Sequence, residues 1–72
     1  MSDALESSAK LYDETAAELE LAAQHCRTAA AHLRDGEVPR GAAHAWVARG
    51  HMLQADDRLG RQAREHAARS IP

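Results

Sequence analysis

Four of the chain's five histidines form two pairs with the same spacing. His25 and His32 are seven residues apart, and so are His44 and His51. Seven residues make about two turns of an α-helix, so the members of each pair lie near one face. Neutral imidazole is a common ligand of zinc and copper. The four histidines are therefore the candidate ligands of a transition-metal site, with zinc or copper as the ion.

The same spacing allows a second interpretation, in which these histidines are ordinary surface or interface residues. Two ligands from one helix usually lie three or four residues apart, and the chain contains no HxxH, HxxxH or ExxH pattern. We expect His25 and His32 to lie on the outward side of their helix, next to Cys26 and Leu33. Both interpretations remain open at this point.

A second pattern with chemical content is an arginine followed five residues later by a histidine. It occurs at Arg27 and His32 and again at Arg61 and His66. A histidine can act as general base while an arginine stabilises developing charge on a phosphate. With Gln62 directly after the second arginine, the pattern resembles the catalytic motif of HEPN-type helical ribonucleases. This resemblance implies cleavage of RNA by Arg61 and His66; the alternative is that the arginine is a solvated partner of acidic residues.

A long helix is predicted to carry the first histidine pair. Large residues recur every seven positions with alanines between them: Leu5, Tyr12, Leu19, Cys26 and Leu33, with Ala9, Ala16, Ala23 and Ala30. This pattern is typical of a helix packed closely against another helix, because small side chains let two backbones approach. We expect this seam to be buried and Cys26 to be an unreactive buried thiol.

The second half of the chain predicts another helix, joined to the first by a short turn. Gly36 suits the left-handed residue after a helix end, and Pro39 suits the first turn of the next helix. We predict helices over residues 3–35 and 39–69 with a turn at 36–38. The fold class is therefore all-α, an antiparallel two-helix hairpin in one domain that spans residues 1–72.

An antiparallel hairpin with this turn brings the two histidine pairs to the same levels. Residues whose numbers sum to about 76 then face each other, which pairs His25 with His51 and His32 with His44. The hairpin also brings the acidic start of the chain beside its basic end. Residues 1–20 have a net charge of −5 and residues 58–72 a net charge of +3.

One chain of 72 residues is too small and too rich in alanine to form a substantial core. Both helices also carry large apolar residues beyond those that one seam needs. We therefore predict a homodimer that forms a four-helix bundle. The residues expected at its interface are the large apolar ones away from the seam: Leu21, Trp46, Met52, Leu53 and Leu59.

Charge and composition argue against several classes of partner. The net charge of −2 does not favour binding to nucleic acid or to an anionic membrane. No apolar run approaches the roughly 20 residues that cross a bilayer. A single cysteine and the absence of a signal-peptide pattern favour the cytoplasm.

Residues 22–60 also resemble an uncharacterised family of short, mainly archaeal helical-hairpin proteins of unknown function. The resemblance rests on Leu53 and five short segments: Gly36-Glu37, Ala42 to Trp46, Gly50-His51, Ala55-Asp56 and Leu59-Gly60. It implies a helical hairpin and supplies no catalytic residues. The sequence thus favours a non-enzymatic protein-interaction or scaffold module that acts as a homo-oligomer, with a different protein as a further candidate partner.

Overall fold

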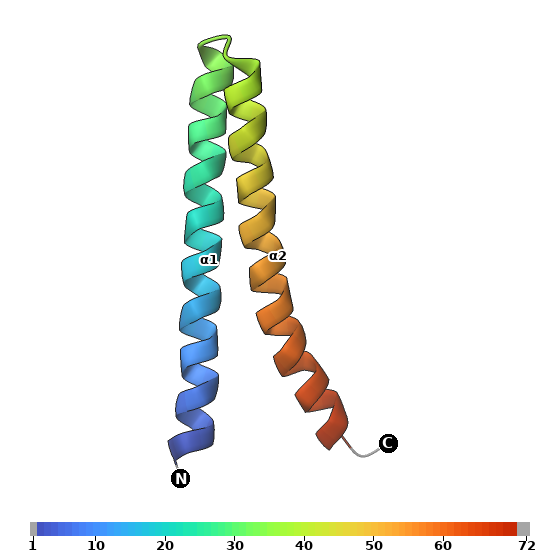
Figure 1. Cartoon of the computed structure of the whole chain (residues 1–72). Coiled ribbons are helices and arrows are strands. Elements are labelled where there is room, and N and C mark those ends of the chain that lie inside the picture. Colours follow the sequence, from blue (N-terminus) through green and yellow to red (C-terminus); the bar gives the residue numbers. More distant parts are fainter. Residues whose placement is uncertain (1, 71–72) are drawn as a thin grey trace.

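The computed structural model describes residues 2–70, which form two α-helices joined by a short turn (Figure 1). Helix α1 spans Ser2–Arg34 and helix α2 spans Val38–Arg69. The helices run antiparallel, so the all-α hairpin is confirmed. Each helix begins one residue earlier than expected, and α1 also ends one residue earlier. The hairpin is long and thin, with dimensions of 53 × 26 × 12 Å.

The turn is a Schellman motif that ends α1 at a glycine. Gly36 has a φ of 77°, a left-handed conformation that costs a glycine little. The backbone N–H of Glu37 donates to the carbonyl of His32 at 2.8 Å, and that of Gly36 donates to Leu33 at 3.0 Å. These two bonds satisfy carbonyls that the helix end leaves open. Pro39 then lies in the first turn of α2, as expected.

The two helices pack through small and polar side chains. On each helix the residues that face the other recur at alternating intervals of three and four, and we call these two rows the contact line. Its members are all buried or half-buried: Ser8, Leu11, Thr15, Glu18, Ala22, His25, Ala29 and His32 on α1, and Gly41, His44, Ala48, His51, Ala55, Arg58 and Gln62 on α2. Leu11, which is 8% exposed, is the only large apolar residue buried among residues 3–70.

The predicted seam is wrong, because its large residues lie outside the contact line. Leu19 and Leu33 are 46% and 53% exposed, and Cys26 is exposed rather than buried. The contact line instead uses alanine and glycine near the turn, where the backbones come closest. A Cβ added to Gly41 would lie 2.8 Å from the Leu33 side chain and 3.2 Å from the carbonyl of Ala29. Close backbone approach therefore selects the row of smaller residues.

The helices lie close together at the turn and move apart toward the chain ends (Figure 1). As a result, the expected meeting of the acidic and basic ends is only partly formed. Arg58 reaches both Glu14 and Glu18, each at 3.5 Å. Within residues 2–70 no other arginine of α2 forms an ion pair with α1, and Arg69 pairs with Glu65 on its own helix. Over the same residues, neither helix is both long and apolar enough to pass through a bilayer.

Candidate functional site

Four histidines form a ladder between the two helices. The rings follow one another in the order His32, His44, His25, His51, so that consecutive rings come from alternate helices. Their centroids are 5.3, 5.2 and 5.6 Å apart, and each neighbouring pair is stacked. The expected pairs, His25 with His51 and His32 with His44, are thus confirmed. The contact between His25 and His44 joins them into one row.

The ladder lies on the inner side of the helices, so the outward placement expected for His25 and His32 is wrong. Both rings belong to the contact line and are half-buried. Each lies three residues after a buried alanine, Ala22 or Ala29, which places it beside the point of closest approach. The small alanines leave room at the sides of the interface, and the imidazoles fill it.

Hydrogen bonds fix the ring orientations along the ladder. The Nδ1 atoms of His25 and His44 lie 3.0 Å apart, so one ring donates a proton and the other accepts it. At the turn end, Nδ1 of His32 donates to Oε2 of Glu37 at 2.8 Å. At the other end, Nδ1 of His51 donates to Oε2 of Glu18 at 2.6 Å. The ladder is therefore closed by a carboxylate at each end.

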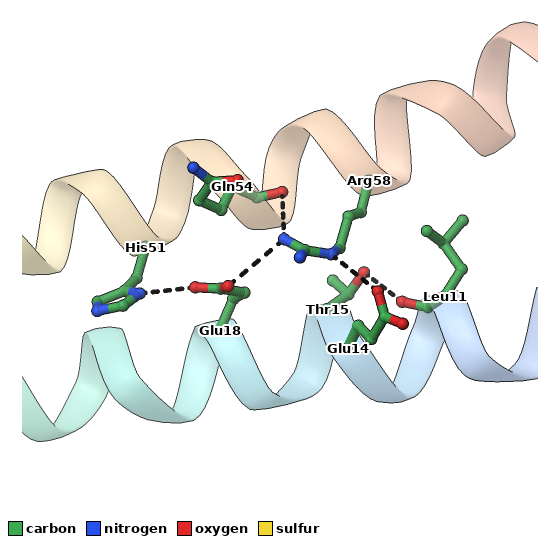
Figure 2. A network of polar contacts seen from close by, with 7 residues as sticks. All are labelled: Leu11, Glu14, Thr15, Glu18, His51, Gln54 and Arg58. Carbon is green, nitrogen blue, oxygen red and sulfur yellow. Dashed lines mark hydrogen bonds and ion pairs between the residues drawn. The ribbon is translucent and has the colours of Figure 1, made fainter.

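The polar chain continues beyond Glu18 toward the open end of the hairpin (Figure 2). Glu18 accepts from His51 through one oxygen and from Nη1 of Arg58 through the other, the latter at 3.5 Å. Nε of Arg58 contacts Glu14, and its Nη1 also contacts the carbonyl of Gln54 at 3.4 Å. We call the row from His32 through the ladder to Glu14 the polar edge. It supplies most of the specific contacts between α1 and α2.

The polar edge does not assemble a metal site within the single chain. In residues 2–70 no three histidine, cysteine, aspartate or glutamate side chains are grouped closely enough to hold a metal ion. Along the ladder, the ring nitrogen atoms of one pair are in contact, Nδ1 of His25 with Nδ1 of His44. Two nitrogen atoms are fewer than the ligands of a metal site. A metal ion at this pair would need further ligands from another molecule, and metal binding by the four histidines stays a prediction.

The two members of each arginine–histidine pair lie in different surroundings. Residues five apart on an α-helix are separated by about 140° around the axis. Accordingly, His66 lines a groove with Tyr12 and Leu59, whereas Arg61 lines a different groove with Leu11. The same separation leaves Arg27 exposed while His32 binds Glu37. The structure thus gives the two members of each pair different surroundings, and the nuclease interpretation stays a prediction.

On the opposite edge of the hairpin, large apolar residues of both helices share a surface. Leu19 of α1 lines a groove together with Met52, Leu53 and Leu59 of α2. Tyr12, one heptad before Leu19, shares the neighbouring groove with Leu59. Leu5, Cys26 and Leu33 continue the same seven-residue row along α1. We call this surface the apolar face.

The residues expected at an interface are exposed in the single chain. Met52, Leu53 and Leu59 are each close to half exposed, and Trp46 is 76% exposed. Leu21 is also exposed, but on the other edge. At 100° per residue, Leu19 and Leu21 lie on opposite sides of the buried Ala22. The structure therefore places four of the five expected residues on or beside one face and separates Leu21 from them.

The carboxylate partners of the ladder were missed by the sequence analysis, although a signal was present. Glu18 precedes His25 by seven residues, and Arg58 follows His51 by seven. Both residues therefore belong to the same rows as the histidines. Extending each histidine row by one heptad would have revealed the Glu18–Arg58 contact as the next level.

The chain was compared with family models, curated proteins and solved structures. No family model matches the chain, and neither does any curated protein or solved structure. The family resemblance noted for residues 22–60 therefore stays a prediction.

Proposed function

We propose that the protein is a small non-enzymatic interaction module that acts as a homodimer, with the apolar face as its interface and a four-helix bundle as its assembled form. The observation that carries this proposal is the contrast between the two edges. The polar edge is satisfied within one chain, whereas Leu19, Met52, Leu53 and Leu59 line one groove and are each 44–47% exposed within the described part of the chain. An exposed apolar surface of this kind is typical of protein interaction sites.

The small core gives a second reason for assembly. Among residues 3–70 the buried apolar residues are Leu11 and four alanines: Ala22, Ala29, Ala48 and Ala55. Full burial of a leucine contributes about 1.5–3 kcal/mol, and an alanine contributes less. Ordering each backbone residue costs about 1–2 kcal/mol. Further burial on the apolar face is the source of stability that the sequence offers.

A second copy is the partner with the best support. The apolar face is carried by both helices and runs along much of the hairpin, so a two-fold axis can bury it against itself. Its groove at Leu19 also contains Arg49 and Asp56, one residue of each charge. A surface with both charges can complement its own copy. We also propose a cytoplasmic location, supported by the single cysteine.

The test is the mass in solution of the untagged protein and of two matched variants. Sedimentation equilibrium is expected to give a dimer for the natural chain. Leu53→Asp places a carboxylate in the interface and should raise the dimer dissociation constant by more than about 100-fold, because burying an unpaired charge costs several kcal/mol. Leu21→Asp, on the other edge, should leave the mass unchanged.

Two results would contradict the proposal. A natural chain that stays monomeric and fully helical at high micromolar concentration would remove the need for a partner. Equal effects of Leu53→Asp and Leu21→Asp would show that the apolar face is not the interface. Circular dichroism of both variants reports whether each chain is still helical.

A further inference from the structure

We propose that the two hairpins pack with their turns at opposite ends, α1 against α1 and α2 against α2, around a two-fold axis that passes near Leu53. This inference rests on the proposed homodimer and specifies its geometry. It follows from three residue patterns along the apolar face, which are self-complementary only when the second copy runs in the opposite direction.

The first pattern is a charged row along the outer margin of the apolar face on α1. Its members recur every seven residues and are all exposed: Glu6, Asp13, Glu20, Arg27 and Arg34. The acidic members occupy the half toward the chain ends and the basic members the half toward the turn. Within residues 2–70 none of the five forms an ion pair.

In an antiparallel pair of α1 helices, charged residues of this row lie beside residues of opposite charge. This arrangement places Glu20 beside Arg27 of the partner subunit and Asp13 beside Arg34 of the partner subunit. The axis repeats both contacts, because in a two-fold interface each pair of residues occurs twice. Both pairs have the same midpoint, between Ala23 and Gln24, so one axis serves them together.

The second pattern is the alanine row of α1. Ala9, Ala16, Ala23 and Ala30 lie between the charged margin and the row of large residues that contains Tyr12 and Leu19. Alanine side chains let two helices approach closely. A close approach brings the charged margins of two α1 helices within reach of each other. The predicted alanine seam is then a seam between molecules rather than within one.

The third pattern lies on α2. Trp46, Leu53 and Gly60 recur every seven residues, so an antiparallel copy places Leu53 against itself and Trp46 over Gly60 of the partner subunit. Trp46 is 76% exposed, and a Cβ added to Gly60 would have only the end of the Arg64 side chain near it, at 3.5 Å. The bulky residue thus meets the position without a side chain.

The midpoints on the two helices agree independently. The Trp46–Gly60 pairing has its midpoint at Leu53, and an Arg49–Asp56 pairing has its midpoint between Met52 and Leu53. The ladder contact of His25 with His51 places the level between Ala23 and Gln24 beside that same point. One axis therefore satisfies both helices.

The other face-to-face arrangement has both turns at the same end and packs α1 against α2 of the second copy. There the charged margin of α1 would face the row that contains Trp46, Leu53 and Gly60, which offers no charge. An arrangement in which charges face like charges, or face no charge, is disfavoured relative to one in which they face opposite charges. The charge pattern therefore selects the antiparallel arrangement.

Charge reversal provides the test. Asp13→Arg with Glu20→Arg makes the α1 margin between positions 13 and 34 fully basic, and Arg27→Glu with Arg34→Glu makes it fully acidic. Each double variant should raise its own dimer dissociation constant at least about tenfold, since like charges then face each other. An equimolar mixture should form a heterodimer, detected by native mass spectrometry, with an affinity near that of the natural dimer. The quadruple variant should again self-associate.

The outcomes separate this inference from the proposed function. A monomeric natural chain would overturn both. A natural dimer in which the mixed variants form no heterodimer would overturn the antiparallel geometry and leave the homodimer standing. As a second measurement, Leu53→Cys in a Cys26→Ser chain should form an intermolecular disulfide under mild oxidation, because the two positions meet at the axis. Gln54→Cys, one residue away and facing elsewhere, is the matched control.

Discussion

Glu18 accepts a hydrogen bond from His51 across the hairpin, with 2.6 Å between Oε2 and Nδ1. Its second carboxylate oxygen contacts Arg58, so that one acidic side chain of α1 holds two basic side chains of α2. All three side chains are mostly shielded from solvent, with 19–26% exposed. This contact joins the histidine ladder to the charged pair near the open end.

Removal of this carboxylate should weaken the hairpin. Glu18→Ala leaves His51 and Arg58 without their partner and should lower the free energy of unfolding by about 1–2 kcal/mol. Urea denaturation at fixed protein concentration measures the change. Asp57→Ala removes an exposed carboxylate on the same protein and should stay within about 0.5 kcal/mol of the natural chain. Equal losses for the two variants would mean that the Glu18 contacts contribute nothing specific.

Two of the helical glycines, Gly41 and Gly50, should respond in opposite ways to substitution by alanine. Nothing lies within 4 Å of a Cβ at position 50, so Gly50→Ala should stabilise α2 by about 0.5–1 kcal/mol through helix propensity. A Cβ at position 41 would lie 2.8 Å from Leu33, so Gly41→Ala should lose stability despite the same gain in propensity. Thermal melts of both variants test this; a stabilised Gly41→Ala variant would show that the close approach at the turn is absent.

The ladder predicts a distinct response at His44, which contacts two other rings of the ladder. Its ring stacks on His25 and His32 and shares a hydrogen bond with His25. His44→Ala removes stacking and hydrogen bond and should cost about 1–2 kcal/mol. His44→Phe keeps an aromatic ring and should recover part of that loss. If both substitutions left the denaturation midpoint unchanged, the ladder would have no role in stability.

Cys26 is a natural probe of the apolar face, because its thiol can be labelled without introducing another cysteine. The thiol is exposed in the single chain and lies one heptad after Leu19. We expect slow reaction with a thiol reagent when the dimer predominates and faster reaction after Leu53→Asp. The rate is followed by absorbance against the fully denatured protein. Equal rates in both proteins would place Cys26 outside the interface.

The sequence predicted the elements well and their faces poorly. Gly36 and Pro39 located the turn, and the level rule paired His25 with His51 correctly. The seam was misassigned because two rows with the same seven-residue period lie one position apart on α1. Large apolar size indicated the seam with Leu19 and Ala23, whereas close backbone approach selects the contact line one position earlier, with Glu18 and Ala22.

The histidine site was only half visible for a related reason. The seven-residue spacing revealed that rings of the two helices lie at the same height along the hairpin, but it did not show that they lie between the helices. That placement depends on the space beside Ala29 and Ala48, which exists only after both helices are in contact. The bond between His25 and His44 is likewise a tertiary contact between different levels and has no signal in either row alone.

The separation of the helices toward the chain ends has a consequence for an unassembled molecule (Figure 1). Arg61 and Arg64 lie on the diverging arm of α2, exposed and without an ion pair in residues 2–70. Local unfolding begins where few apolar contacts hold a segment. In a monomer, a trypsin-like protease should therefore cut first on this part of α2. Formation of the dimer would then also protect the protein from degradation.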